Sequence, residues 1–188
     1  MIVGIPKEVK DNEKRVALTP FGASQLVNNG HTVLLENNAG LASGYANKKY
    51  LSLGVKIVNS PKEIFNQSEL IVKVKEPQNS EISLIKDGQM VFAFFHFAAY
   101  TDLLDKFLKT NAIAIAYETV EDKNGLLPIL TPMSEVAGRM SIQSGAKYLE
   151  GTFGGKGTLL SGVPGVEPAT VTIIGAGVVG MNAAKVAA

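Results

Sequence analysis

Short runs of β-branched and other apolar residues recur along this chain, and they constrain its fold more than any other feature. Several runs are apolar throughout instead of alternating with polar residues. Parallel strands that are covered on both faces have this pattern. The runs span residues 2–6, 32–36, 55–58, 69–75, 89–95, 112–117 and 170–175.

Helix-start patterns lie between many of these runs. Thr19 followed by Pro20 is typical of a helix N-cap with proline at the first helical position. Ser60 with Glu63 three residues later forms a capping-box pattern, again with proline at the first helical position. Strands that alternate with helices predict an α/β fold with a mostly parallel sheet. We assign residues 1–128 to this lobe and expect it to bind the substrate.

The alternation of strand and helix patterns ends in the rest of the chain, residues 129–188. A long helix is expected over 134–150, followed by a connector rich in glycine and proline over 151–168. A strand at 170–175, a glycine-rich turn and a helix start come last. We interpret this part as a connecting helix, a connector and the first βα unit of a Rossmann-type dinucleotide-binding domain, which the chain leaves incomplete.

The turn has the spacing G-x-G-x-x-G, with glycines at 175, 177 and 180. It follows a predicted strand and opens an apolar helical run, which is the context that a dinucleotide site requires. The backbone N–H groups of Val178 and Val179 would then face a pyrophosphate. A tight strand–helix turn without a ligand would have the same pattern. Because the chain stops at Ala188, before the acid expected about 20 residues further on, we expect it to bind NAD weakly or not at all.

Composition excludes several classes of function. Lys and Arg number 18 against 17 Asp and Glu, so the net charge of +1 gives no case for nucleic-acid or membrane partners. The chain has no cysteine, which excludes disulfides and thiolate chemistry. No spacing of His, Asp and Glu suggests a metal site. Without a signal-peptide pattern or an apolar run of about 20 residues, we expect a cytoplasmic protein.

Four polar residues follow predicted strands, at the edge where open α/β sheets bind ligands. Arg15 offers a fork that suits a carboxylate, although an isolated arginine is more often a solvated loop charge. Lys75 ends its strand, while we expect Lys73, on the same strand, to snorkel or to pair with an acid. His96 is a candidate acid/base, although a lone histidine beside apolar sequence is more often a core residue. Glu118 follows the sixth run.

Long stretches of the chain resemble the alanine dehydrogenases, a family within a wider group that includes the NAD-binding subunit of proton-translocating transhydrogenase. The histidine of "FHFAA" and the segment "TPMSEVAGR" favour the alanine dehydrogenases over the transhydrogenase relatives. The resemblance covers the whole chain, and its most recognisable pieces are "VGIPKEVKDNEKRVALTP", "LIVKVKEP", "FAFFHFAAYTDLL", "IAYETVEDKNGLLPILTPMSEVAGRMS" and "GGKGTLLSGVPGVEPATVTIIGAGVVG".

This resemblance implies reversible NAD-dependent oxidative deamination of L-alanine to pyruvate and ammonium. Arg15 matches the carboxylate-binding arginine of the family, Lys75 its substrate lysine and His96 its catalytic acid/base. Ser134 matches a cofactor-contacting serine, and the turn Gly175–Gly180 matches the pyrophosphate loop.

Length separates this chain from the family, whose members are much longer. We therefore expect part of a longer enzyme, with this chain inactive by itself. A catalytically silent fragment that retains the substrate lobe, or a transhydrogenase relative, is the alternative. The apolar residues of the last helical run would leave an apolar surface uncovered, and they are Ala183, Ala184, Val186 and Ala187. We therefore expect self-association, as a homo-oligomer, or disorder beyond about Gly175.

Overall fold

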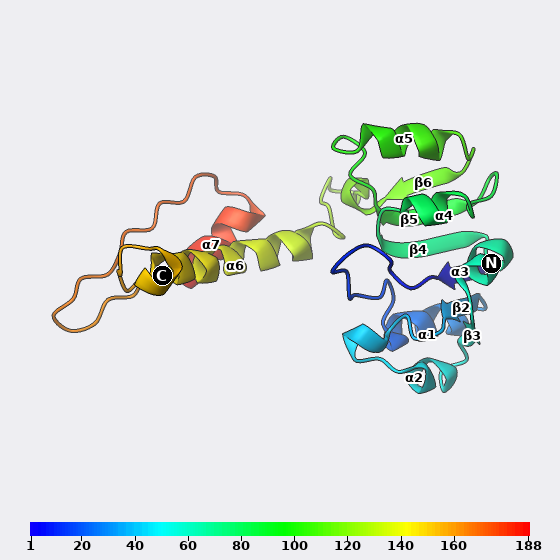
Figure 1. Cartoon of the computed structure of the whole chain (residues 1–188), viewed down its shortest axis with the longest axis horizontal. Coiled ribbons are helices and arrows are strands. Elements are labelled where there is room, and N and C mark those ends of the chain that lie inside the picture. Colours follow the sequence, from blue (N-terminus) through cyan, green and yellow to red (C-terminus); the bar gives the residue numbers. More distant parts are fainter. The chain divides into compact units, whose positions relative to one another are not determined.

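The computed structural model describes residues 1–188 and divides into two compact units, Met1–Val120 and Glu121–Ala188 (Figure 1). The boundary expected from the sequence, at residue 128, lies inside the second unit. As a boundary between functions it stays a prediction.

The first unit is built on a six-stranded sheet in which every neighbouring pair of strands is parallel. The predicted α/β class is therefore confirmed, and each of the first six apolar runs forms a strand. In spatial order the strands are β3 (Lys56–Val58), β2 (Thr32–Glu36), β1 (Ile2–Ile5), β4 (Leu70–Lys75), β5 (Met90–Phe94) and β6 (Ile113–Ala116).

Helices fill the connections between the strands, and two of them begin where the sequence predicted. The Thr19 hydroxyl accepts a hydrogen bond from the Gly22 N–H, and the Ser60 hydroxyl accepts one from the Glu63 N–H. Both side chains satisfy donors that a helix start leaves free. The helices of this unit are α1 (Pro20–Asn28), α2 (Asn47–Leu51), α3 (Pro61–Gln67), α4 (Asn79–Ile82) and α5 (Thr101–Leu108), with the short 3₁₀ turns η1 (Leu41–Ser43) and η2 (Tyr117–Thr119).

Two hydrophobic clusters place helices on both faces of the sheet. On β2, Leu34 packs into the cluster that holds the α3 and α5 side chains. Val33 and Leu35, which alternate with it, pack into the cluster that holds α1 and α2 side chains. This alternation is expected of a strand buried on both faces. At the β6 edge the covering is incomplete, because Ile113 stays 52% exposed.

The strand order has a topological switch point at the carboxyl ends of β1 and β4. From β1 the chain moves outward through β2 to β3, then returns through α3 to β4 on the other side of β1. Loops that leave β1 and β4 therefore run in opposite directions, which is the switch point where doubly wound sheets bind ligands. Residues 6–19 follow β1 and residues 76–78 follow β4, so both loops lie at this point.

The second unit consists of α6 (Thr131–Leu149), the 3₁₀ turn η3 (Gly151–Phe153) and α7 (Val178–Ala187). The helix α6 begins three residues before the predicted start at 134. It packs closely on α7 at Gly138, where a side chain would clash with the carbonyl oxygen of Val179. No helix of the structure has both the length and the apolar character that crossing a membrane requires.

The strand expected at 170–175 is not formed in this structure. Residues 169–176 have no regular secondary structure, and Ile174 is 96% exposed. A strand needs a neighbour to accept and donate its ladder hydrogen bonds. The second unit contains no other strand, only an isolated bridge between Val163 and Val166, so an apolar run alone is not sufficient here.

Candidate active site

The structure brings the four sequence-predicted polar residues of the first unit to one edge of the sheet. Arg15 lies in the loop between β1 and α1, and Lys75 is the last residue of β4. His96 follows β5 by two residues, and Glu118 lies in η2, directly after β6. Because β1, β4, β5 and β6 are adjacent and parallel, their carboxyl ends share this edge.

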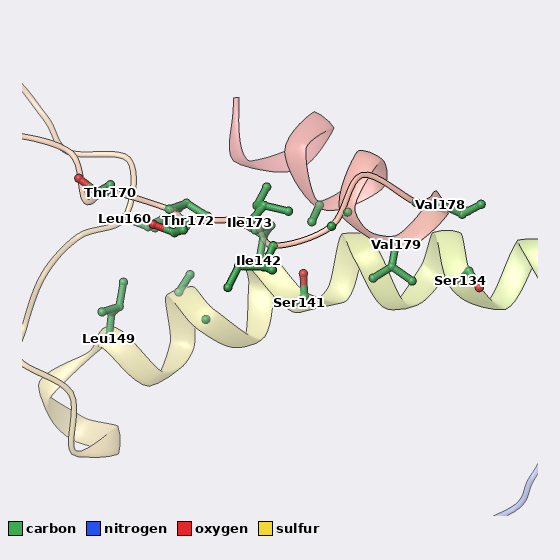
Figure 2. Close-up of a pocket in the computed structure, with 18 residues that line it drawn as sticks. Ser134, Ser141, Ile142, Leu149, Leu160, Thr170, Thr172, Ile173, Val178 and Val179 are labelled. Carbon is green, nitrogen blue, oxygen red and sulfur yellow. The ribbon is translucent and has the colours of Figure 1, made fainter. Parts of the chain in front are cut away.

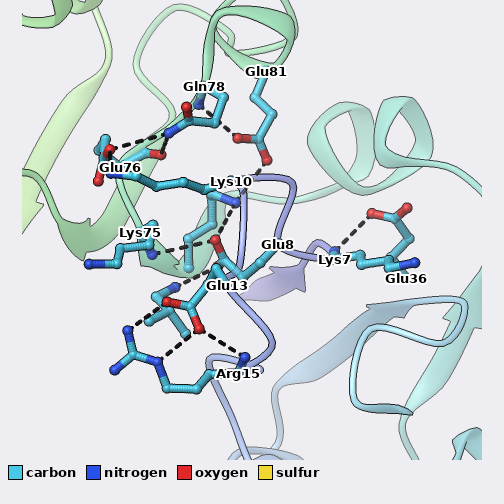
Figure 3. Close-up of polar contacts among 12 residues, drawn as sticks. Lys7, Glu8, Lys10, Glu13, Arg15, Glu36, Lys75, Glu76, Gln78 and Glu81 are labelled. Atoms are coloured by element: carbon cyan, nitrogen blue, oxygen red, sulfur yellow. Dashed lines mark hydrogen bonds and ion pairs between the residues drawn. The ribbon is translucent and has the colours of Figure 1, made fainter. Parts of the chain in front are cut away.

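Arg15 is held in place by Glu13, a residue that the sequence analysis did not single out (Figure 3). Its Nε donates to one Glu13 carboxylate oxygen at 2.8 Å, and its Nη2 donates to the other at 2.6 Å. The backbone N–H of Arg15 also donates to this carboxylate, at 2.9 Å. The hydrogen bonds from Arg15 lower the pKa of Glu13 from 4.5 to about 2. Arg15 is therefore an oriented cation, and not a freely solvated loop charge.

A small cavity of about 290 Å³ lies against this pair. Glu13 occupies the Nε and Nη2 edge of the guanidinium, while no protein group accepts a hydrogen bond from Nη1. The volume is near the lower end of ordinary ligand pockets, so it suits a small ligand. Charged side chains dominate the lining, which comprises Lys7, Glu8, Glu13, Lys14, Arg15, Asn38, Ala39, Leu41 and Ala42.

The two lysines at the end of β4 have opposite environments. Lys73 is fully buried, and its ammonium pairs with Glu8 at 3.1 Å and with Glu81 at 2.8 Å. The expectation that Lys73 pairs with an acid is confirmed. The Lys75 side chain is half-buried, and no carboxylate lies within ion-pair distance of its ammonium. Of the two cations, Lys75 is the one left free for an anionic or carbonyl ligand.

His96 is exposed and has a left-handed backbone conformation, with φ of 52°. Its backbone N–H donates to a Glu118 carboxylate oxygen at 2.7 Å, and its ring stacks on that of Phe94, with 6.0 Å between the ring centroids. Non-glycine residues rarely adopt this conformation, and when they do they often lie at functional sites. The imidazole does not belong to the core, so the core-histidine interpretation loses its support.

The glycine-rich turn of the second unit has the conformation that its spacing requires. Gly175 has φ of 100°, and a side chain at Gly180 would clash with the Gly175 carbonyl oxygen. Around Gly177 there is open space. Gly177 caps α7 without a side-chain hydrogen bond, so the N–H groups of Val178 and Val179 have no protein acceptor. These open amides fit an anionic group such as a pyrophosphate.

A cavity of about 730 Å³ adjoins this turn (Figure 2). It lies between α6, the segment 170–174 and the start of α7, and Ser134 contributes to it from α6. All of the sequence-predicted cofactor residues line it, namely Ser134, Gly175, Gly177, Val178, Val179 and Gly180. Neither unit contains a group of three or more His, Cys, Asp or Glu residues that could hold a metal ion.

Comparison with known proteins places the chain in a family. Residues 4–137 match the family model described as "Alanine dehydrogenase/PNT, N-terminal domain". The chain belongs to the alanine dehydrogenase/PNT family. Residues 141–188 match the corresponding "Alanine dehydrogenase/PNT, C-terminal domain".

Relatives within the alanine dehydrogenase/PNT family match the whole chain. The alanine dehydrogenase of Bacillus subtilis is 54% identical and that of Methanococcus maripaludis 52% identical, both over 187 residues. The chain covers 49% and 50% of these two proteins, so it spans about half their length.

Solved structures agree with this assignment. An L-alanine dehydrogenase superposes with a TM-score of 0.92 at 48% identity, covering all of this chain and 52% of the other. A transhydrogenase from Sinorhizobium meliloti superposes with a TM-score of 0.81, covering all of this chain and 53% of the other. Its identity is 23%, so this second likeness shows the fold alone.

Proposed function

We propose that this chain supplies the substrate-binding unit, and the first part of the NAD-binding region, of an alanine dehydrogenase. Such an enzyme interconverts L-alanine with pyruvate and ammonium. The observation that carries the proposal is the pair of cations at the switch point, an Arg15 oriented by Glu13 and a Lys75 without an ion-pair partner. This arrangement suits a small 2-oxo acid, which has one carboxylate and one adjacent carbonyl oxygen.

Arg15 and Lys75 divide the recognition of pyruvate between them. The guanidinium of Arg15 attracts the carboxylate and donates to it through Nη1, while Glu13 keeps the rest of the fork in place. The ammonium of Lys75 donates to the carbonyl oxygen, which makes C2 more electrophilic. Arg15 keeps its pair with Glu13 while Nη1 binds the substrate. Lys75 has no ion pair to break, since the buried acids Glu8 and Glu81 both pair with Lys73.

His96 moves the protons of the reaction. Reductive amination of pyruvate adds ammonia at C2 and loses the carbonyl oxygen as water, so a group at the site must give a proton to the departing oxygen. An imidazole nitrogen can accept a proton and donate it again, which suits His96 to this transfer. In the direction of deamination, His96 takes a proton as water adds to C2.

The glycine-rich turn and Ser134 hold the dinucleotide. The open N–H groups of Val178 and Val179 would donate to the pyrophosphate, and Ser134 lines the same cavity, which supports this role. When bound, NAD(H) supplies the hydride exchange at C2. Residues 1–188 contribute the binding groups that this step requires from the N-terminal half.

The comparisons favour this function over that of a transhydrogenase subunit. Identity is 52% and 54% to the two alanine dehydrogenases named above and 23% to the transhydrogenase structure. The remaining alternative is a catalytically silent fragment. Turnover of alanine with NAD by the 188-residue chain would support activity of the fragment itself, whereas we expect none.

The decisive test uses a polypeptide that contains this sequence and has the full length of its relatives, called the complete chain below. Replacing His96 by Ala should lower the rate of pyruvate reduction roughly 10²–10⁴-fold, with little change in melting temperature. The control is His31→Ala, because His31 is the other histidine and has no proposed role. Near-normal turnover of H96A would remove His96 from the mechanism. A lower melting temperature with turnover retained would restore the core-histidine interpretation.

Two properties of the 188-residue chain also follow from the proposal. We expect it to bind NAD weakly or not at all, because one βα unit forms only part of a dinucleotide site. Submicromolar binding in a calorimetric titration would contradict this. We also expect a homo-oligomer, which size-exclusion chromatography with light scattering would test.

A further inference from the structure

The buried carboxylate of Glu8 has no part in the chemistry above, although it lies beside the proposed substrate lysine (Figure 3). Glu8 is 8% exposed, and both of its oxygens accept hydrogen bonds. One accepts from the backbone N–H of Val74 at 2.7 Å. The other accepts from the Lys73 ammonium at 3.1 Å and from the backbone N–H of Lys75 at 3.4 Å. One side chain thus contacts the last three residues of β4.

These contacts fall where the sheet no longer holds β4 regularly. Its pairing with β1 ends at Ile71, opposite Gly4. Its pairing with β5 shifts register between Val72 and Lys75, where three steps along β4 match two steps along β5. Such a bulge interrupts the hydrogen-bond ladder and redirects side chains. Glu8 supplies acceptors to two backbone N–H groups of this irregular segment.

The two lysines at the bulge differ in burial and in ion pairing. Lys73 is fully buried between Glu8 and Glu81, whereas the ammonium of Lys75 has no ion-pair partner. A side chain held on an irregular segment keeps its place only if the backbone beneath it is anchored. The anchor at the backbone of Lys75 is the Glu8 carboxylate, which arrives from the loop after β1.

We propose that Glu8 is a positioning residue, which fixes the end of β4 so that the Lys75 ammonium meets the substrate carbonyl. This rests on the proposed function, because it takes Lys75 as the lysine that binds the 2-oxo acid. Glu8 acts through the backbone of β4 in this proposal, although its side chain also lines the small cavity beside Arg15. Burial raises the pKa of Glu8 above 4.5, while Lys73 opposes this shift and favours the ionised form.

Glu81 provides a matched control within the same chain. It is also buried, at 3% exposed, and it also pairs with Lys73. Its second oxygen accepts from the Gln78 N–H at 2.8 Å, and it makes no hydrogen bond to the N–H groups of β4. If the buried acids act only by balancing the charge of Lys73, Glu8→Gln and Glu81→Gln should have the same consequences. A positioning role predicts that they differ.

The first arm of the test needs no enzymatic activity and uses the 188-residue chain. Amide hydrogen exchange is measured by NMR for Val74 and Lys75 in the wild type, E8Q and E81Q. We expect exchange at these two amides to accelerate about tenfold or more in E8Q, because the neutral glutamine oxygen is a weaker acceptor for their N–H groups than the Glu8 carboxylate. In E81Q their exchange should stay unchanged. Equal protection in E8Q and the wild type would overturn the proposal.

The second arm uses the complete chain and measures KM for pyruvate and for NADH separately. E8Q should raise KM for pyruvate about tenfold with KM for NADH unchanged, and E81Q should leave both near the wild-type values. Similar KM values for pyruvate in E8Q and E81Q, or an equal rise of both KM values in E8Q, would overturn the proposal. Should E8Q fail to fold, E8D keeps the charge on Lys73 while its shorter side chain withdraws from β4, and the same selective rise is expected.

The two arms separate this inference from the proposed function. If the wild-type complete chain does not reduce pyruvate, the proposed function fails, and the link from Glu8 to a substrate fails with it. If the wild type is active but the amides of Val74 and Lys75 are equally protected in E8Q, only the role of Glu8 fails.

Discussion

Glu8 and Glu13 lie five positions apart in one loop, yet their carboxylates have opposite environments. Hydrogen bonds from Arg15 lower the pKa of Glu13 to about 2. Burial raises the pKa of Glu8, because the surroundings cannot replace all of the hydration of its charge. Both lie in the same stretch, residues 3–20, and nothing in the local sequence distinguishes one carboxylate from the other. Their roles follow from which donors the fold brings to each of them.

Replacing Arg15 by Lys in the complete chain should weaken pyruvate binding while leaving the charge in place. A lysine cannot hold the Glu13 carboxylate with two parallel bonds and also offer a third donor to the substrate. We expect KM for pyruvate to rise roughly tenfold to a hundredfold, the loss of about one charged hydrogen bond. Arg139→Lys, at the other arginine of the chain, is the control and should leave KM unchanged. An unaltered KM in R15K would exclude Arg15 from substrate binding.

The Glu13–Arg15 pair should make the stability of the first unit depend on pH in the acid range. Because the pKa of Glu13 is lowered from 4.5 to about 2, the pair stabilises the folded state above pH 4.5, and this contribution is lost as the pH falls toward 2. Arg15 is half exposed, so the contribution should be at most about 1 kcal/mol. Urea unfolding of the wild type and of Glu13→Gln across this range measures it. The same pH dependence in both would contradict the prediction.

At the scale of elements, two glycines of α6 have contrasting surroundings. Gly138 lies against α7, with the Val179 carbonyl oxygen where a side chain would be. Gly145, on the same helix, has open space around it. The first glycine permits two helices to approach closely, whereas the second has no packing reason to be glycine.

Alanine substitutions at these two positions should have opposite effects on unfolding. Gly145→Ala should stabilise α6 by up to about 1 kcal/mol, because alanine has the higher helix propensity. Gly138→Ala gains the same propensity but forces α6 away from α7, so we expect a net loss of stability. Urea unfolding followed by circular dichroism measures both. A G138A variant as stable as G145A would show that the close approach is not required.

At the scale of the whole molecule, the hydrophobic core belongs to the first unit. Both buried clusters lie within Met1–Val120. In Glu121–Ala188 only Gly138, Asn182 and Ala183 are buried. The first unit therefore contains the apolar burial that stabilises a domain, and the second contains little of it.

This contrast predicts different resistance to hydrogen exchange in the two units. Amides of β1, β4 and β5 should exchange most slowly, since they open only when the core of the first unit unfolds. Amides of α6 and α7 should exchange much faster, because few buried contacts oppose their local opening. Hydrogen exchange of the 188-residue chain with mass spectrometry measures this. Equal protection in both units would contradict the prediction.

In a separate test, a fragment of residues 1–120 should unfold cooperatively.

Local features of the sequence were sufficient to predict much of this protein. Caps at Thr19 and Ser60 mark the helix starts, because a cap depends only on neighbours within one turn. Six of the seven apolar runs form the predicted strands, and their carboxyl ends indicated Arg15, Lys75, His96 and Glu118 as edge residues. The conformation of the glycine-rich turn could also be predicted, because only glycine tolerates φ of 100° and the close contact at Gly180.

Other features of this protein were decided only by the tertiary structure, because they depend on groups that are distant in the sequence. Glu8 and Lys73 are 65 positions apart, and they meet because β1 and β4 are neighbours in the sheet. The alternation of side chains predicts that Lys73 and Lys75 share one face, whereas the bulge in β4 leaves one buried and the other free. Conversely, the apolar run at 170–175 forms no strand, since backbone hydrogen bonding in a sheet needs a second strand. Sequence periodicity describes a single segment. Ion pairs, bulges and hydrogen-bond ladders each depend on two segments that are brought together by the fold.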